Sequence, residues 1–191
     1  MSTKNKYIIT GGPGAGKTSL LTALRGLDYH CSEEASRQLI MEELEKNSNC
    51  LPWMDLHCFA DRVLERMVAL YHATQGNDLV FFDRGIPDII AYLIVADLAV
   101  PEKYYAIAQR YLYDKTVFLL PPWPEIYIRD RARWQTFEEA EAIYHQIKTT
   151  YRLSGYRLIE LPRASVGQRV KIIREHLEGG NNNNSKKGYE L

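Results

Sequence analysis

A glycine-rich segment near the amino terminus has the spacing G-x-x-x-x-G-K-[ST], which is typical of a loop that wraps around phosphate groups. Its glycines allow backbone N–H groups to face an anion, and a lysine and a hydroxyl follow at the start of the next helix. The pattern predicts that Lys17 contacts β- and γ-phosphates during catalysis and that Thr18 ligates Mg²⁺. The residues expected to bind a nucleoside triphosphate are Gly12, Pro13, Gly14, Ala15, Gly16, Lys17, Thr18 and Ser19.

The sequence around this loop supports the phosphate-binding interpretation. The apolar run Tyr7–Thr10 precedes the loop and predicts a buried strand, while residues 19–24 predict a helix after it. A glycine-rich turn without a phosphate role is the alternative. Because strand, loop and helix occur in the order that a P-loop requires, we favour the P-loop.

A second candidate site follows another apolar run, Leu79–Phe82, which ends in Asp83 and Arg84. Ligands of parallel sheets lie beyond the carboxyl ends of the strands, so we expect Asp83 beside the P-loop. Asp83 is expected to hold Mg²⁺ or to accept a proton from an attacking hydroxyl, and Arg84 to bind an anionic substrate during catalysis. The alternative for Asp83 is a cap on the next turn.

Motifs of hydrolytic nucleotide-binding proteins are missing after this strand. An AAA+ ATPase usually has glutamate directly after the strand acid, where this chain has Arg84. A regulatory GTPase has D-x-x-G, but Ile86 stands at that offset from Asp83. The sequence therefore favours transfer to a second substrate over hydrolysis.

Two further polar clusters follow predicted strands. Arg129, Arg131 and Arg133 come after the strand Thr116–Leu120 and predict a lid, in which Arg129 binds nucleotide and Arg131 and Arg133 stabilise transferring charge. A solvated charged helix end is the alternative. After the strand Tyr29–Cys31, Glu33 or Glu34 is predicted to bind a sugar hydroxyl of the acceptor and Arg37 an anion. Ordinary acidic residues at a helix start explain the glutamates nearly as well.

Composition limits the classes of partner. The 24 Lys and Arg residues balance the 24 Asp and Glu residues, so the overall charge indicates neither nucleic acid nor an anionic membrane. Three cysteines without C-x-x-C spacing predict a reducing cytoplasm and no disulfide framework, and Cys50, His57 and Cys58 lack a fourth zinc ligand at a suitable spacing. The short polar start leaves no room for a signal peptide, and the most apolar segment, 89–100, is too short to span a bilayer. We expect a soluble, cytoplasmic protein.

The remaining pattern predicts one α/β domain over residues 1–178 and a flexible polar tail over 179–191. Besides the four strands already placed, a fifth is expected at Arg157–Leu161, and helical patterns separate the strands. Capping boxes at Thr136 and Ser165 predict the starts of the last two helices, of which the second ends near Leu177.

In order and spacing, residues 6–177 resemble the nucleoside and nucleotide kinase branch of the P-loop NTPases. The layout is similar to the AAA-labelled domain that includes the kinase part of ribosylnicotinamide kinase, and more distantly to deoxynucleoside and thymidylate kinases. The resemblance implies a five-stranded parallel sheet in the order 2-3-1-4-5 with helices on both faces. It also implies Mg²⁺ and ATP as cofactors, with GTP as the other donor, and a nucleoside-, nucleotide- or vitamin-like acceptor.

Two functions follow from this resemblance. The first is a small-molecule kinase, and the second is a nucleotide-dependent binding or regulatory protein that hydrolyses slowly. The chain departs from deoxynucleoside kinases at Gly85, where they typically have serine, and no glutamine is evident that would read a nucleobase. The sequence does not indicate an oligomeric state.

Overall fold

Five parallel strands form one sheet in the order β2-β3-β1-β4-β5, as the family resemblance implied. The computed structural model describes residues 5–74, 78–127 and 135–185, with side chains up to residue 179. The strands are β1 (Lys6–Gly11), β2 (His30–Cys31), β3 (Val80–Asp83), β4 (Thr116–Leu120) and β5 (Arg157–Glu160). In the register of the central strands, Ile9 of β1 lies opposite Asp83 of β3. The end of β3 therefore lies beside the loop that follows β1.

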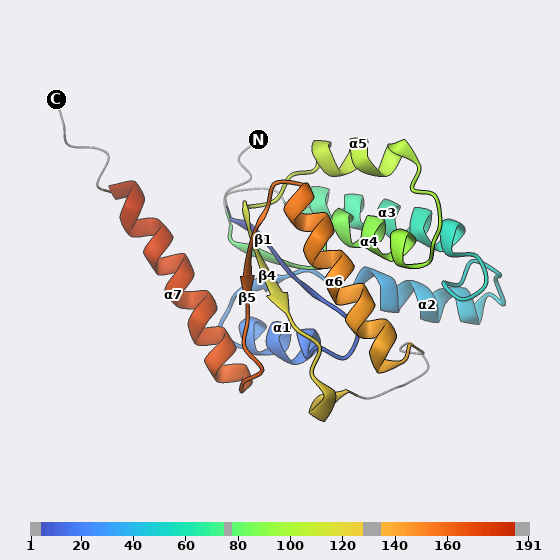
Figure 1. Cartoon of the computed structure of the whole chain (residues 1–191). Coiled ribbons are helices and arrows are strands. Elements are labelled where there is room, and N and C mark those ends of the chain that lie inside the picture. Colours follow the sequence, from blue (N-terminus) through green and yellow to red (C-terminus); the bar gives the residue numbers. More distant parts are fainter. Residues whose placement is uncertain (1–4, 75–77, 128–134, 186–191) are drawn as a thin grey trace.

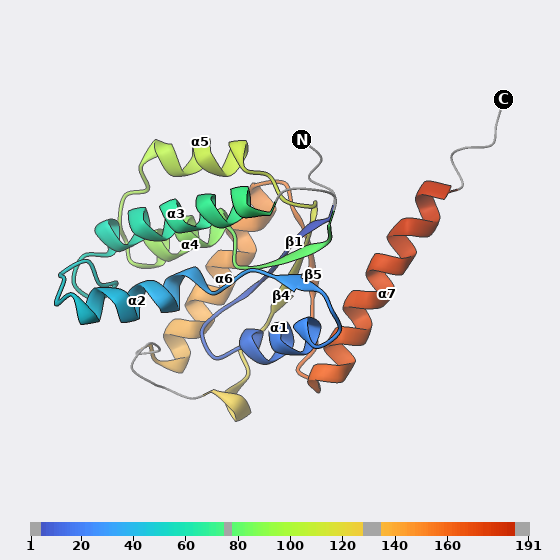
Figure 2. The same cartoon turned by 180° about the vertical axis from the view of Figure 1, so that it is seen from behind.

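Helices cover both faces of this sheet, as Figures 1 and 2 show. They are α1 (Lys17–Arg25), α2 (Ala35–Glu45), α3 (Leu56–Ala73), α4 (Ile86–Val95), α5 (Glu102–Arg110), α6 (Phe137–Leu153) and α7 (Val166–Ser185), with a short 3-10 helix at Pro124–Ile126. Successive strand residues point to opposite faces. Ile9 thus packs in the core beneath α1 and α7, whereas Ile8 packs in the core beneath α4 and α6.

A third apolar cluster joins α2, α3, α4 and α5 beyond the sheet. The apolar stripe that the sequence places on one side of α3 includes Phe59, Val63 and Met67, and all three are buried in this cluster. The stripe therefore packs in the core, and its helical spacing is typical of such a face. It also forms a wall of the cavity described below.

Both predicted capping boxes are present. Thr136 Oγ1 accepts a hydrogen bond from Glu139 N, and Thr136 N donates to Glu139 Oε2. Ser165 Oγ likewise accepts from Gln168 N at 3.3 Å. The predicted end of the last helix near Leu177 is wrong, because α7 continues to Ser185. Extending an existing helix by one residue is far easier than nucleating one, so glycines and asparagines do not by themselves end it.

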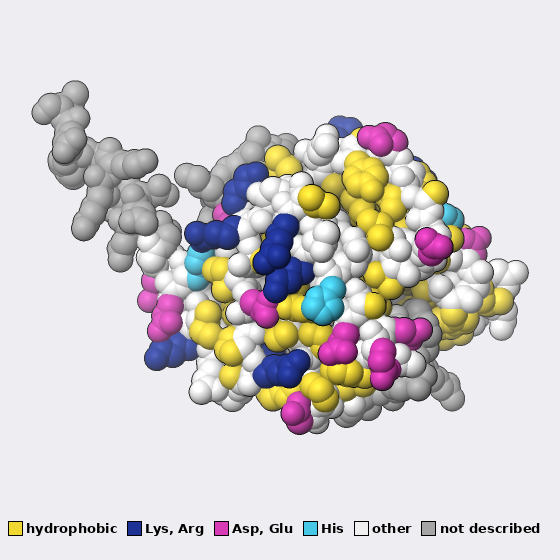
Figure 3. All heavy atoms as spheres, in the orientation of Figure 1, with side chains coloured by type: hydrophobic (Ala, Val, Ile, Leu, Met, Phe, Trp, Pro, Cys, Tyr) yellow, Lys and Arg dark blue, Asp and Glu magenta, His cyan; other side chains and the backbone are white. Residues whose placement is uncertain are grey.

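Charge and polarity are mixed on the surface. Figure 3 shows Lys, Arg, Asp and Glu side chains interspersed over the face that Figure 1 presents, in keeping with the formal net charge of zero. Within the described ranges, no helix has both the length and the apolar character that crossing a bilayer requires.

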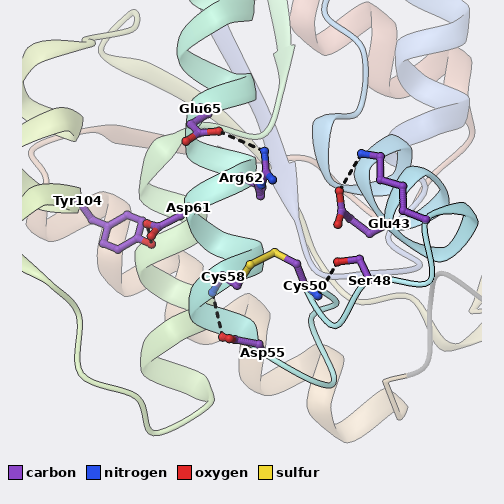
Figure 4. The surroundings of a disulfide bond; sticks show 10 residues. Glu43, Ser48, Cys50, Asp55, Cys58, Asp61, Arg62, Glu65 and Tyr104 are labelled. Carbon is purple, nitrogen blue, oxygen red and sulfur yellow. Dashed lines mark hydrogen bonds and ion pairs between the residues drawn. A yellow bond between two sulfur atoms is a disulfide. The ribbon is translucent and has the colours of Figure 1, made fainter.

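The cysteine prediction is wrong, because Cys50 and Cys58 form a disulfide (Figure 4). Cys50 lies in the loop after α2, and Cys58 lies in the first turn of α3, where its N–H donates to the capping carboxylate of Asp55. The intervening loop folds back and brings the two Cα atoms within 5.3 Å. Cys31 is the remaining free thiol. The spacing of the cysteines did not reveal the pair, because it is the fold of the loop that brings Cys50 and Cys58 together. The cytoplasmic location stays a prediction.

This disulfide yields a prediction about stability. Closing so short a loop lowers the entropy of the unfolded chain, and we expect the Cys50→Ala/Cys58→Ala variant to lose about 2 kcal/mol in the free energy of unfolding. Urea unfolding of the natural protein and of the variant, both without reductant, measures this loss, with Cys31→Ser as the control. An intact mass that does not rise by two hydrogens on reduction would contradict the pairing.

Candidate functional site

The predicted P-loop connects β1 to α1 and has the backbone that its glycines permit. Gly14 and Gly16 have φ angles of 72° and 85°, a left-handed region that other residues rarely adopt. A Cβ atom on Gly14 would also lie 2.4 Å from the Tyr127 ring, so a larger residue does not fit there. The last glycine of the loop is the N-cap of α1, which places the positive end of the helix dipole at the loop.

Lys17 lies back across this loop. Its Nζ donates to the carbonyl oxygens of Gly11 and Gly12, at 3.0 Å each. Burial, reinforced by the charge of nearby Arg84, lowers the pKa of Lys17 to about 8, so the side chain is still mostly protonated at neutral pH. Thr18 and Ser19 follow Lys17 in the first turn of α1. Both are exposed, and both line the cavity that Lys17 also lines.

Asp83 ends β3, as predicted, and its carboxylate is buried. Its Oδ1 atom has no hydrogen-bond partner among the described residues. Burial raises the pKa of Asp83 to about 6, while the charge of Lys17 opposes that rise. The helix cap predicted as the alternative is wrong, because Gly85 is the N-cap of α4. Mg²⁺ prefers oxygen ligands. Asp83 offers an unpartnered carboxylate oxygen and Thr18 offers a hydroxyl, so the chemistry of these two residues fits that ion.

Arg84 has a left-handed backbone, with φ at 71°, and its guanidinium turns into the site. Its Nη1 donates to Gly11 O at 3.0 Å and to Asp88 Oδ1 at 3.1 Å, and the guanidinium lies 5.3 Å from the centre of the Tyr92 ring. Although burial acts to lower the pKa of Arg84, the neighbouring Tyr92 and Asp88 raise it above its ordinary value. Arg84 is therefore a fixed positive charge beside the P-loop.

Asp88 holds Arg84 in place, and sequence reasoning missed it. One carboxylate oxygen accepts from Thr10 Oγ1 and Arg84 Nη1, and the other accepts from Gly85 N at 2.9 Å and from Tyr151 OH at 2.5 Å. The spacing Gly85-x-x-Asp88 is that of a capping box with glycine in place of serine. The sequence therefore contained the spacing of a capping box, but the pattern was not recognised because glycine stands where serine or threonine is usual.

The structure separates the two glutamates predicted to contact an acceptor. Glu34 and Arg37, at the start of α2, line the cavity next to the P-loop. Glu33 is exposed and does not line it; its Oε2 accepts from Gln38 Nε2 at 2.7 Å. Of the two glutamates, Glu34 is therefore the one that borders the cavity.

The predicted lid residues Arg129, Arg131 and Arg133 lie outside the described residues, and their roles stay predictions. The chain on either side of them reaches the cavity through Ile126 and Gln135. The lid would therefore connect two segments that already border the site.

A second residue missed in the sequence, Arg169, supports the P-loop from behind. It is buried at the start of α7, where its Nη1 donates to Ala15 O at 3.1 Å and its Nε donates to Pro162 O at 2.8 Å. Its guanidinium lies 4.9 Å from the Trp123 ring centre, and burial lowers its pKa. No local pattern marks this arginine, because its partners are distant in the sequence.

These residues surround one cavity of about 670 Å³. The P-loop, the starts of α2 and α7, helix α4 and the apolar stripe of α3 all contribute to its walls. The cavity is lined by residues 13–19, Glu34, Ser36, Arg37, Ile40, Pro52, Leu56, Phe59, Ala60, Val63, Met67, Arg84, Asp88, Ile89, Tyr92, Leu93, Val95, Ala96, Trp123, Ile126, Gln135, Glu139, Ile143, residues 164–166 and Arg169.

Residues 6–169 match a protein family described as an AAA domain. The chain belongs to this family. No curated protein matches it. Among solved structures, the deoxyadenosine kinase of M. mycoides with the products dCMP and dCDP is similar, with a TM-score of 0.64 and 17% identity over 91% of this chain and 99% of the kinase. The YorR protein of Bacillus subtilis, in complex with phosphorylated GDP, has a TM-score of 0.59 and 17% identity over 93% and 98%.

At these identities the likeness concerns the fold alone. Together with the family match and the strand order, it confirms the resemblance drawn from the sequence: this AAA domain has the P-loop fold of nucleoside and nucleotide kinases.

The raised pKa of Asp83 predicts a dependence of stability on pH. Because the pKa lies near 6 in the folded protein and at 3.8 ordinarily, folding favours the protonated form, and the buried charge destabilises the protein increasingly as pH rises from 4 to 6. Asp83→Asn removes that charge. We expect this variant to match the natural protein near pH 4 and to exceed it above pH 6 by on the order of 2 kcal/mol in unfolding free energy.

Urea unfolding without nucleotide at pH values from 4 to 7 measures this difference, and Asp97→Asn, at an exposed position, is the control. A variant that is less stable than the natural protein at pH 7 would contradict the assigned cause.

Proposed function

We propose that this AAA domain is a small-molecule kinase, which transfers the γ-phosphoryl group of Mg²⁺-ATP to the hydroxyl or phosphate of an acceptor. The observation that carries the proposal is that one cavity is lined both by the P-loop and by Glu34, Arg37 and Arg84. A volume of about 670 Å³ lies within the range of small-molecule sites. A site for hydrolysis alone needs no such second compartment.

The donor triphosphate lies along the P-loop, with its charge met by the loop N–H groups and the α1 dipole. Lys17 exchanges the carbonyl oxygens of Gly11 and Gly12 for β- and γ-phosphate oxygens. Thr18 and Asp83 would hold Mg²⁺, which would offset phosphate charge. ATP is the donor that the family resemblance implies, and GTP is the alternative.

The acceptor lies between α2, α3 and α4. Arg84 is fixed next to the P-loop and stabilises charge on the transferring group. Glu34 lines the cavity and takes the proton of the acceptor hydroxyl, whereas Asp83 does not line it. Arg131 and Arg133 of the lid add positive charge over the γ-phosphate, and Arg129 binds the nucleotide.

The similar solved structures support this proposal. The M. mycoides deoxyadenosine kinase has been solved with dATP and with dCMP and dCDP, which are nucleotides bound in a related fold. We propose a cytoplasmic location, where a nucleoside triphosphate is abundant.

Acceptor-dependent ADP release tests the kinase directly. We expect purified protein with Mg²⁺ and ATP or GTP to release nucleoside diphosphate faster when the acceptor is added, in a panel of nucleosides, nucleotides, vitamins and simple alcohols. Lys17→Ala should reduce that rate by about 100-fold or more, because it removes a charge that acts in the transition state. Lys171→Ala, at an exposed position of α7, is the matched control and should leave the rate unchanged.

A different result would support the regulatory alternative. If diphosphate release stays slow with every acceptor, while nucleotide changes the binding of a protein partner, the kinase proposal is wrong.

A further inference from the structure

The end of the cavity away from the P-loop is lined almost entirely by apolar side chains. From α3 the stripe Leu56, Phe59, Ala60, Val63 and Met67 faces it, roughly 16 Å long at the rise of an α-helix. Ile40 of α2 and Leu93 of α4 complete this wall. None of these side chains donates a hydrogen bond, and the only acceptor among them is the weakly accepting sulfur of Met67.

The polar groups of the cavity are confined to the end near the P-loop. Glu34, Ser36 and Arg37 lie in the first turn of α2, and Tyr92 lies against the guanidinium of Arg84. Asp88 also borders the cavity, but four donors already occupy its two oxygens. Recognition of a hydroxyl or phosphate is thus separated in space from the apolar wall.

The two polar residues on the α6 side do not change this distribution. Glu139 is engaged with Thr136 N at 2.6 Å, in the helix cap. Gln135 is 8% exposed, and its Oε1 is inaccessible. Both lie where α6 starts, close to the P-loop, since a Cβ atom on Gly12 would lie 2.7 Å from the carbonyl oxygen of Ala140.

The apolar wall ends in exposed apolar side chains. Val95, which lines the cavity, is 37% exposed, and its neighbour Ile94 is 40% exposed. On the α3 side, Trp53 and Met54 are 43% and 58% exposed and lie between the lining residues Pro52 and Leu56. Exposed apolar side chains thus flank lining residues in the sequence of both α4 and the segment before α3.

We propose that the acceptor is an alcohol with an uncharged, apolar body, such as a hydrocarbon chain, and not a nucleoside. This inference rests on the proposed kinase function and names its substrate class. The polar edge of a nucleobase would leave water without gaining a partner on the α3 wall, and each such unpaired group weakens binding by a factor of roughly 5 to 150. A methylene group gains roughly fourfold in the same place.

The reaction itself is ordinary phosphoryl transfer. The hydroxyl oxygen of the alcohol forms a bond to the γ-phosphorus, and the bond from that phosphorus to the oxygen bridging to the β-phosphate breaks. ADP leaves with that oxygen, and the hydroxyl proton passes to the carboxylate of Glu34. The products are an alkyl monophosphate and ADP.

The test compares acceptors that share a primary hydroxyl and differ in their body. ADP release with Mg²⁺-ATP is measured for 1-butanol, 1-hexanol, 1-octanol, geraniol and farnesol below their solubility limits, and for thymidine, deoxyadenosine, guanosine and glycerol. We expect kcat/KM to rise by up to about fourfold per methylene along the alkanols and to be lowest for the nucleosides and glycerol.

A matched pair of variants locates the effect in the cavity. Val63 lines the cavity, whereas Val68, on the same helix, packs against the core and does not line it. Val63→Thr should raise KM for octanol at least fivefold with kcat little changed, because the added hydroxyl weakens binding of the chain. Val68→Thr should leave KM unchanged, and urea unfolding of both variants confirms that they fold.

The outcomes separate this inference from the proposed function. Turnover with a nucleoside and none with any apolar alcohol would overturn the inference and leave the kinase intact. Equal KM values for octanol in Val63→Thr and the natural protein would overturn it as well. Diphosphate release that no acceptor increases would contradict the kinase, and the inference with it.

Discussion

The site depends on one buried carboxylate, Asp88. It joins three parts of the fold, because Thr10 comes from β1, Arg84 from the turn after β3 and Tyr151 from α6. A buried charge is tolerated when each of its oxygens is hydrogen-bonded, and removing one partner leaves the other charge buried and unpaired. Asp88 therefore allows Arg84 to keep its left-handed backbone and to contact Gly11 of the P-loop.

The other charges of the site follow from this arrangement. Arg84 and Lys17 both donate to Gly11 O, and the fixed charge of Arg84 reinforces the effect of burial in lowering the pKa of Lys17. Asp83 is buried nearby with its pKa raised. Buried ionisable groups such as Lys17 and Asp83 destabilise the protein when no ligand is bound, and bound phosphate and metal would offset this loss of stability. Asp88 thus fixes the charge of Arg84 beside the P-loop before any ligand binds.

Local patterns predicted much of the fold and part of the site. The P-loop, the position of Asp83 and the cap at Thr136 depend on neighbours in the chain, so a short motif reveals them. Arg169 was missed because its partner Ala15 lies 154 residues away. Asp88 was missed because glycine stands in its capping box where serine is usual, and its partner Thr10 lies 78 residues away. The disulfide and the separation of Glu33 from Glu34 depend on how the chain turns around α2, which spacing alone does not encode.

The most direct test of this account is a double-mutant cycle in urea unfolding with Asp88→Asn and Arg84→Gln. Asp88→Asn alone should cost about 3–5 kcal/mol, and the double variant should lose at least about 2 kcal/mol less than the sum of the single losses, because Arg84 no longer remains buried and unpaired. The partly exposed pair Glu42 and Arg66, joined by two bonds of 2.8 Å, is the control and should couple by less than about 1 kcal/mol. Losses at Asp88 and Arg84 that add within about 0.5 kcal/mol would contradict the central role of Asp88.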